Sequence, residues 1–348
     1  MPIHINNQLS INTESQSLCE KQPLKTLAII NTTSGSGKAW KHFQSIRPIW
    51  DKCGVVYDMF KTRYAGHLTK RLASDKHITR YDKVVVFGGD GTFAEAVKGL
   101  EDNPWTDQIF NKICLGIIPS GSGNGLSRSL HFAVNRPYSV KEAAKMAAQS
   151  AFRHLDLIEV VQQGRKLTGF LAVNMGLIAD IDILSEPLRF LGDIRYTIEA
   201  IKSIWRNKAY NARLTYLPED EEEVHRTDKD QAQSTNLKTL SGRFSLIMIG
   251  NTSHCSATAH TAPGAQMDDG YMYVAVMKEV SRWTLLKVLL KLDSGRWTEE
   301  AGVKCFKTKF IKLEPLSHDI ILTLDGERMP IEPIECRTRQ AALRVLCG

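Results

Sequence analysis

The segment Lys83-Val-Val-Val-Phe-Gly-Gly-Asp-Gly-Thr92 allows the fold to be predicted. Its apolar run predicts a buried β-strand, and the apolar spacing over residues 92–100 predicts a helix directly behind it. Between the two, Asp90 stands among three glycines and is the only titratable group of the turn. Ligands of open α/β sheets bind at this carboxyl end of a strand, and a tight turn needs fewer glycines. We therefore predict that Asp90 belongs to a functional site.

The same succession of strand, glycine-rich loop and helix occurs on both sides of this segment. A predicted strand over 24–30 runs into Asn31-Thr-Thr-Ser-Gly-Ser-Gly-Lys38, and another over 113–118 runs into Pro119-Ser-Gly-Ser-Gly-Asn-Gly125. The alternation continues to about residue 150. It predicts a doubly wound α/β domain with a mostly parallel sheet and helices on both faces.

Three glycine-rich loops at successive strand ends indicate a binding site for a polyphosphate. Glycines allow backbone N–H groups to approach an anion closely, and the following helix adds the positive end of its dipole. Taken singly, the loops at 31–38 and 119–125 are also compatible with an ordinary turn or surface loop. The first loop, moreover, lacks the GxxxxGK[ST] pattern of a Walker P-loop. The expected convergence of all three at one sheet edge favours the functional interpretation.

Beyond residue 151 the chain changes to strand-like runs that follow one another. Helical stretches interrupt them mainly around 187–208 and 281–293, which predicts a β-rich, sandwich-like second domain. The predicted strands cover 155–161, 167–175, 212–217, 244–249, 271–276, 306–313 and 320–324. We expect a flexible N-terminal tail at 1–24, an α/β domain at 25–150 and a β-rich domain at 151–348 with a polar loop insertion at 218–242.

Composition narrows the classes of protein that remain. The 348 residues carry a formal net charge of +7, which suits an anionic partner such as a nucleotide phosphate or an acidic membrane. No run of 18 apolar residues and no secretory signal is present, so we expect a protein without a membrane span. The seven cysteines are dispersed without a CxxC pair, which excludes a disulfide framework or zinc site and favours the cytoplasm. No basic stripe is interleaved with aromatics, so we expect no nucleic-acid binding.

The motifs together resemble a known family. GGDGT and PSGSGNG, about 30 residues apart and preceded by a strand and the NTTSGSG turn, resemble the diacylglycerol-kinase-type catalytic domain of lipid kinases. The segment Gly176–Arg195, which reads GLIADIDILSEPLRFLGDIR, is similar to a segment of the sphingosine kinases. Ser253-His254, Ala262-Pro-Gly264 and Leu324-Asp-Gly-Glu327 are further matches, so the resemblance spans about residues 25–330.

The resemblance implies a role for each matching residue. Asp90 would deprotonate the attacking lipid hydroxyl, and Asp182 would bind the lipid head group. ATP, with Mg²⁺, would lie in the cleft between the two domains. Arg189 and Arg195 would reach its phosphates, and Asp325 and Glu327 would close the site from the second domain. The remaining groups that would line the ATP site are Asn31, Thr62, Gly89, Gly91, Glu95, Ser120, Gly121 and Ser122.

The resemblance implies a cytoplasmic ATP:sphingoid-base kinase that visits membranes. A sphingoid base carries a cationic amine that a carboxylate at Asp182 can bind through charge-assisted hydrogen bonds, whereas ceramide and diacylglycerol carry no cation. The alternatives are a ceramide or diacylglycerol kinase of the same fold, and a catalytically silent lipid- or nucleotide-binding scaffold. Two smaller alternatives also remain: Arg189 and Arg195 as surface ion-pair residues, and His254 as a structural residue rather than an acid or ligand.

Residues 195–210 predict a basic amphipathic helix. Ile194, Ile198, Ile201 and Trp205 fall on one face, and the polar side carries lysine and arginine. Such a helix suits an anionic membrane surface or a calmodulin-like partner, but it is equally compatible with a helix that packs this face on its own core. The sequence leaves open whether the chain forms a homodimer.

Overall fold

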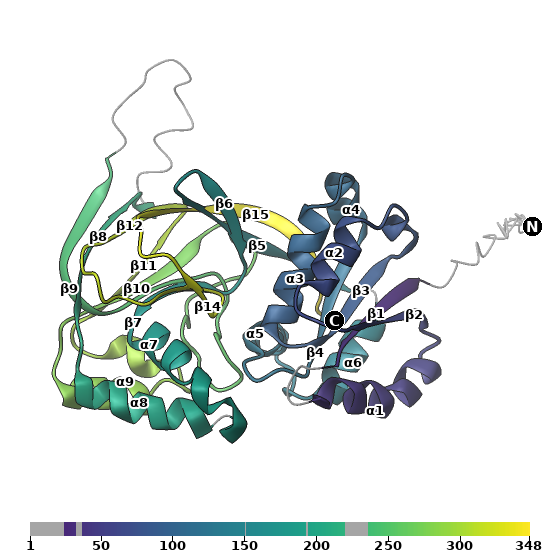
Figure 1. Cartoon of the computed structure of the whole chain (residues 1–348), viewed down its shortest axis with the longest axis horizontal. Coiled ribbons are helices and arrows are strands. Elements are labelled where there is room, and N and C mark those ends of the chain that lie inside the picture. The colour runs from purple at the N-terminus through teal and green to yellow at the C-terminus, as the bar shows by residue number, and fades with distance from the viewer. Residues whose placement is uncertain (1–23, 33–36, 150, 193, 220–235) are drawn as a thin grey trace, which may run out of the picture.

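The computed structural model describes residues 24–32, 37–149, 151–192, 194–219 and 236–348. Figure 1 shows two domains side by side, an α/β domain that contains the N-terminal strands and a β-rich domain. The predicted tail at 1–24, apart from its last residue, lies outside the described residues, as does most of the predicted polar insertion. The fold class predicted from the sequence is confirmed.

The first domain alternates strands and helices as predicted. In chain order its elements are β1 (Lys25–Asn31), α1 (Lys38–Lys52), β2 (Val56–Thr62), α2 (His67–Ala73), β3 (Lys83–Gly88), α3 (Asp90–Glu101), α4 (Thr106–Lys112), β4 (Cys114–Pro119), α5 (Gly125–Ala133) and α6 (Val140–Ala148). The four strands pair in parallel in the order β4-β3-β1-β2. The carboxyl ends of β1, β3 and β4, which carry the glycine-rich loops, are therefore neighbours.

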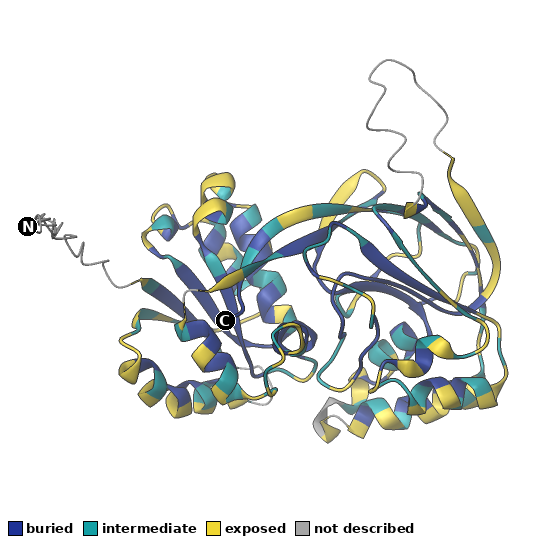
Figure 2. Cartoon of the chain, turned by 180° about the vertical axis from the view of Figure 1, so that it is seen from behind, coloured by how far each residue is buried: buried dark blue, intermediate teal, exposed yellow. Residues whose placement is uncertain are grey.

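Helices cover both faces of this sheet. Phe43 and Trp50 of α1 pack with alanines of α6 on one face, and Leu68 of α2, Phe93 of α3 and Leu130 of α5 pack on the other. Figure 2 shows the result: β1, β3 and β4 are mostly buried, the edge strand β2 is largely exposed or half-buried, and the outer sides of the helices are exposed. Because β1, β3 and β4 are packed on both sides, their carboxyl ends are fixed at one edge of the sheet.

The second domain begins with β5 (Phe152–Gln162) and is mostly antiparallel. Its further elements are β6 (Arg165–Gly169), β7 (Ala172–Gly176), α7 (Leu177–Leu184), a 3₁₀ segment (Glu186–Leu191), α8 (Ile194–Arg206), β8 (Tyr210–Tyr216), β9 (Lys238–Gly250), β10 (Met272–Lys278), α9 (Arg282–Leu290), β11 (Val303–Thr308), β12 (Phe310–Pro315), β13 (Leu322–Leu324), β14 (Glu327–Met329) and β15 (Ile334–Leu346). One apolar core lies between the strands, and a second lies between the sheet and helices α7, α8 and α9.

Strand β15, which the sequence analysis did not predict, joins the two domains. It pairs antiparallel with β5 along its length, and its last residues pair in parallel with β4 at Arg344↔Cys114 and Val345↔Leu115. Leu343 and Val345 are buried in the core of the first domain. The predicted domain boundary at residue 150 therefore does not separate the two domains completely, because the C-terminal strand β15 belongs to both (Figure 1).

Several other boundaries differ from the prediction. The runs 167–175 and 306–313 each form two strands, and two short helices, α4 and α7, were not predicted. The expected polar insertion at 218–242 overlaps β9, which begins at Lys238 and pairs with β8. The connection between these strands is thus shorter than expected.

Candidate active site

Asp90 lies at the point where the second and third glycine-rich loops meet. It is the first residue of α3, and its two carboxylate oxygens accept hydrogen bonds from the backbone N–H groups of Gly125 (2.8 Å) and Leu126 (3.1 Å), which begin α5. Burial raises the pKa of this carboxyl above its ordinary value, and the backbone hydrogen bonds oppose that rise. The site therefore offers one oriented carboxylate that can accept a proton.

The glycines around Asp90 allow backbones to approach closely. A Cβ added to Gly121 would lie 2.4 Å from the Cα of Gly89, so the two loops are in backbone contact. A Cβ at Gly125 would lie 2.6 Å from the carbonyl carbon of Cys255, in the second domain. Asn124, in the left-handed conformation, fixes the third loop because its amide hydrogen-bonds both the N–H (3.0 Å) and the C=O (2.8 Å) of Gly121.

Asn31, Thr62 and Glu95 extend the site along the sheet edge. The Asn31 amide donates to the Thr92 hydroxyl at 2.8 Å, and the Thr62 hydroxyl donates to the Asn31 oxygen at 3.3 Å. Glu95 accepts a hydrogen bond from the N–H of Gly66 at 3.0 Å, just before α2. Three of the predicted residues are thus brought to one edge, whereas most of the first glycine-rich loop (33–36) lies outside the described residues.

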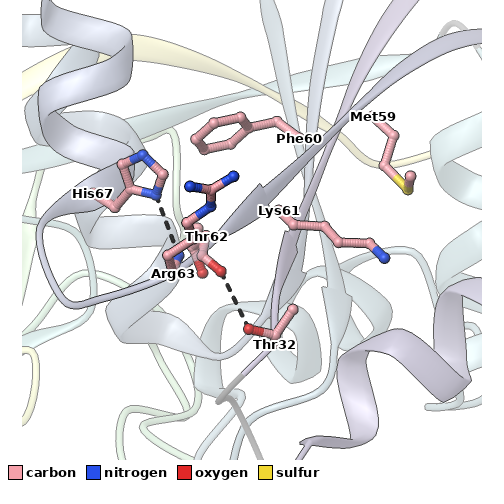
Figure 3. A pocket seen from close by; sticks show the side chains of 7 residues that line it. All are labelled: Thr32, Met59, Phe60, Lys61, Thr62, Arg63 and His67. Atoms are coloured by element: carbon pink, nitrogen blue, oxygen red, sulfur yellow. Dashed lines mark hydrogen bonds between the residues drawn. The ribbon is translucent and has the colours of Figure 1, made fainter.

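An open pocket of about 710 Å³ lies beside this edge (Figure 3). Only Thr62 of its lining residues was predicted to be functional; the others are Thr32, Met59, Phe60, Lys61, Arg63 and His67. In Figure 3 the hydroxyl of Thr32 donates to the C=O of Thr62 at 3.1 Å, and the N–H of Arg63 donates to the ring of His67 at 3.2 Å. The position of this segment at the carboxyl end of β2 was the signal that could have identified it.

Ser120 has a partner that sequence reasoning missed. Its hydroxyl lies 2.9 Å from Nδ1 of His42, which α1 carries across to the third loop. Burial and the charge of Lys38 lower the pKa of His42. Ser122, in the same loop, is exposed. The contact between His42 and Ser120 joins the helix after the first loop to the loop after β4.

Asp325 is held by the backbone at the turn between β13 and β14. Its carboxylate accepts hydrogen bonds from the N–H groups of Phe170 (2.9 Å), Leu171 (2.9 Å) and Ala172 (3.0 Å). Its φ of 51° is left-handed, and the next residue, Gly326, also has a positive φ. Burial, with a contribution from the charge of Asp90, raises the pKa of Asp325 to about 6. The charge coupling places the two carboxylates near each other, whereas Glu327 is exposed.

Asp182 lies beside the same turn. Its Oδ2 would be 3.1 Å from a Cβ added to Gly326, so only glycine leaves this space open. Burial, with smaller contributions from the charges of Asp182 and Asp90, raises the pKa of the Cys255 thiol to about 12. Cys255 is therefore near both carboxylates, which brings Asp90, Asp182 and Asp325 to the junction of the two domains.

The segment around Cys255, in the second domain, contacts the third glycine-rich loop (119–125) of the first domain. The N–H of Ala257 donates to the C=O of Gly123 at 2.7 Å, and Ser256 forms a β-bridge with Asn124. The backbone N–H of His254 donates to the Ser129 hydroxyl at 3.0 Å, and the His254 ring stacks on the His260 ring with centroids 4.2 Å apart. Burial lowers the pKa of His254 to about 3, so its ring is neutral at physiological pH. These contacts favour the structural role for His254.

The two predicted phosphate-binding arginines are not brought to Asp90 by any contact in the described residues. Arg195 is buried, with its guanidinium 4.3 Å from the centroid of the Tyr196 ring, and its Nη1 has no hydrogen-bond partner among the described residues. The side chain of Arg189 lies outside the described residues. Burial of Arg195 excludes the alternative that it is a surface ion-pair residue.

The predicted apolar face of α8 does not pack on the core of its own domain. Ile194 (62%), Ile201 (51%) and Trp205 (69%) are exposed, while Arg195, Glu199, Ala200 and Ser203 are buried instead. Trp283, on the neighbouring α9, is 76% exposed. The alternative that this face is internal is wrong.

No three His, Cys, Asp or Glu side chains among the described residues are close enough to form a metal site by themselves. In the same part of the chain, no helix has the length and apolar character needed to cross a membrane.

Known proteins resemble this chain over both of its domains. A family model described as the diacylglycerol kinase catalytic domain matches residues 25–160, and one described as the YegS C-terminal NAD kinase beta sandwich-like domain matches residues 172–347. The chain therefore belongs to the lipid kinase family that combines these two domains. A crystal structure described as that of a diacylglycerol kinase from Bacillus anthracis has the same fold, with a TM-score of 0.64 and 18% identity over 94% of this chain and 98% of that one.

The curated relatives include sphingosine and sphingoid-base kinases at modest identity. Sphingosine kinase 1 of Arabidopsis thaliana is 27% identical over 317 residues, and this chain spans 65% of the length of that protein while the match covers 84% of this chain. Sphingosine kinase 1 of Mus musculus is 26% identical over 94% of this chain and 92% of the mouse protein. Sphingoid long chain base kinase 4 of Schizosaccharomyces pombe is 26% identical over 91% of this chain and 73% of the yeast protein.

The contact between Gly89 and Gly121 can be tested by adding one methyl group. Gly121→Ala is expected to push the two loops apart and lower the thermal unfolding temperature, because the new Cβ would lie 2.4 Å from the Cα of Gly89. Gly91→Ala, in the first turn of α3 and with open space around its Cβ, is the matched control and should not lower that temperature, because alanine is a better helix former than glycine. Equal effects of the two changes in differential scanning fluorimetry would contradict the close backbone approach.

Proposed function

We propose that this protein is an ATP-dependent kinase of sphingoid bases that phosphorylates the primary hydroxyl of sphingosine or a related long-chain base. The observation that carries the proposal is the placement of Asp182 and Asp90 around one point, Cys255, at the junction of the domains. A carboxylate at Asp182 suits the cationic amine of the lipid, and one at Asp90 suits the adjacent hydroxyl. The names of the curated relatives support the same substrate class.

ATP would lie along the glycine-rich loops at the carboxyl ends of β1, β3 and β4. The backbone N–H groups of these loops favour phosphate oxygens, whereas the first N–H groups of α5 already bind the carboxylate of Asp90. The unpaired Nη1 of Arg195 suits a phosphate oxygen, and Lys61 and Arg63 add positive charge beside Thr62. We propose that Asn31, Thr62, Glu95, Ser120, Ser122, Arg189 and Glu327 also belong to this nucleotide site.

Mg²⁺ fits the site as an ion that arrives with the nucleotide. When bound, it would neutralise phosphate charge during phosphoryl transfer. Because the described residues contain no ready group of three metal ligands, the protein itself would contribute at most one or two carboxylates. Asp90 and Asp325 are the candidate carboxylate ligands of Mg²⁺, although each already accepts backbone hydrogen bonds.

Asp90 acts as the proton acceptor in this proposal. Two backbone donors orient its carboxylate, so it does not rotate away from an incoming hydroxyl. Its raised pKa makes it a better base than an ordinary aspartate, but only above the pH at which it ionises. Asp325 holds the β13–β14 turn against the start of β7 and thereby positions the segment that faces Asp182.

The lipid substrate is expected to be taken from a membrane surface. The exposed face of α8 and α9 carries Trp205 and Trp283, and the guanidinium of Arg282 lies 5.6 Å from the Trp205 ring. Lys202 and Arg206 are also partly exposed, so the apolar face has a basic border. We assign this face to peripheral docking on an anionic bilayer, which tryptophan and arginine both favour.

A lipid panel tests the substrate class. Purified protein with Mg-ATP should phosphorylate sphingosine in mixed micelles and leave ceramide and diacylglycerol largely unused. Asp182→Asn should lower kcat/KM for sphingosine by about 10- to 100-fold, the effect of losing a charged hydrogen bond, with little change in ATP affinity. Product from ceramide or diacylglycerol alone would contradict the assignment of Asp182, and no product from any lipid would contradict the kinase proposal.

Replacement of Asp90 tests the base. Asp90→Asn is expected to lower kcat by about 100-fold or more, while ATP still binds by calorimetry. Asp107→Asn, an exposed aspartate of α4, is the control and should be without effect. In the unmodified enzyme, kcat should fall as the pH drops through the raised pKa of Asp90, because protonation removes the acceptor. An unchanged rate in Asp90→Asn would remove this residue as base.

Vesicle binding tests the docking face. Trp205→Ser with Trp283→Ser should weaken co-sedimentation with phosphatidylserine-containing vesicles by about tenfold or more, because both indoles leave the interface. Trp105→Ser, at a tryptophan 51% exposed in the first domain, should bind as the unmodified protein does. Unchanged vesicle binding in the double variant would reject the assignment, and capture by calcium-loaded calmodulin instead would reassign the face to a calmodulin-like partner.

A further inference from the structure

Two buried polar side chains lie next to each other in the second domain, and each has an oxygen without a hydrogen-bond partner among the described residues. Asn174 of β7 pairs in register with Thr323 of β13. Asn174 is 6% exposed and Thr323 is fully buried. Neither Oδ1 of Asn174 nor Oγ1 of Thr323 has a hydrogen-bond partner among the described residues.

Both side chains are on the side of the sheet that α7 covers. In β7, Val173 and Met175 pack in the core between the strands, so the alternate residue Asn174 faces the helices. In β13, Leu322 and Leu324 pack in that same core, which leaves Thr323 on the side of Asn174. The layer around them is apolar and includes Ala172, Leu177, Leu246, Met248 and Tyr273, with Ile178 and Ile181 packed against it.

This polar pair is close to the proposed lipid head-group site. Thr323 is two residues before Asp325. Gly326, which follows Asp325, lies against the carboxylate of Asp182. Asp182 is on α7, which follows β7 directly and packs on β7 and β9. Figure 1 shows α7 beside β7 and β14. A lipid whose amine is bound at Asp182 and whose chain enters the apolar layer would pass this pair.

An unpaired polar group inside a protein lowers the stability of the fold, and two adjacent ones are unusual. An apolar pair of the same shape would avoid that loss of stability in the free protein. The carboxamide oxygen of Asn174 accepts a hydrogen bond, and the hydroxyl of Thr323 donates or accepts one. A single lipid hydroxyl can therefore bind both.

We propose that Asn174 and Thr323 form a polar subsite that binds an additional hydroxyl group of the long-chain base, on the chain next to its amino-alcohol head. The inference rests on the proposed function and makes its substrate more specific. A site built to hydrogen-bond a hydroxyl discriminates against the analogue that lacks it, because its own polar groups are then left unpaired. The enzyme thus prefers hydroxylated long-chain bases.

Two saturated bases that differ by one hydroxyl provide the test, sphinganine and 4-hydroxysphinganine. The unmodified enzyme should show a kcat/KM at least about tenfold higher for the hydroxylated base. The near-isosteric Thr323→Val, alone and combined with Asn174→Leu, should remove this preference while kcat/KM for sphinganine changes by less than about threefold. Thr323→Ser keeps the hydroxyl and should keep the preference.

Thermal unfolding without lipid provides a second readout. Because the Thr323 hydroxyl has no hydrogen-bond partner among the described residues, Thr323→Val should leave the unfolding temperature unchanged or raise it; a marked decrease would indicate a structural role instead. Equal use of the two bases by the unmodified enzyme, or a preference that survives Thr323→Val, would overturn the subsite and leave the kinase proposal intact. Phosphorylation of neither base would overturn the kinase proposal and the subsite with it.

Discussion

The pair of hydrogen bonds from the start of α5 to the carboxylate of Asp90 is the interaction on which the rest of the site depends. It joins the loop after β3 to the loop after β4, and it can form only because Gly89 and Gly121 bring their backbones into contact. The same bonds orient the carboxylate, while burial raises its pKa. One local arrangement thus produces both the geometry and the basicity of the proposed proton acceptor.

The position of the second domain follows from two connections to the first. Strand β15 runs from the β-rich domain into the parallel sheet and buries Leu343 and Val345 there. The segment around Cys255 rests directly on Gly125, where no side chain would fit. Together they place Asp182 and Asp325, which belong to the second domain, near Asp90, which belongs to the first. The proposed transfer site is therefore shared between the domains.

The sequence predicted those parts of the fold that depend on local pattern. Strands with continuous apolar runs, such as β3 and β4, and the helices behind them were predicted within a few residues. Strand β15 was missed because its centre, Arg337-Thr-Arg-Gln340, is polar and because its partners are distant in the chain. Helix α7 was missed because it is short and follows β7 without a polar turn.

The site residues likewise divide into those that a local motif or the family resemblance predicted and those that depend on tertiary contacts. Asp90 and the glycines were predicted as site residues because they stand together in one short motif. Asp182 and Asp325 were predicted only through the resemblance to the family. His42 and the Asn174–Thr323 pair depend on tertiary contacts that no local pattern reveals, whereas the position of Lys61 near the end of β2 was a signal that was not used. The role of Arg195 as a phosphate ligand stays a prediction, which its buried Nη1, without a hydrogen-bond partner among the described residues, is suited to fulfil.

We propose that one lipid is held between Asp182 and Asp90 with its hydroxyl directed at ATP. A crystal structure of the protein with a non-hydrolysable ATP analogue and sphingosine would show this arrangement. We expect the lipid amine within hydrogen-bond distance of the Asp182 carboxylate and the primary hydroxyl within about 3 Å of Asp90, facing the γ-phosphate. A lipid bound with its head group away from both carboxylates would contradict it.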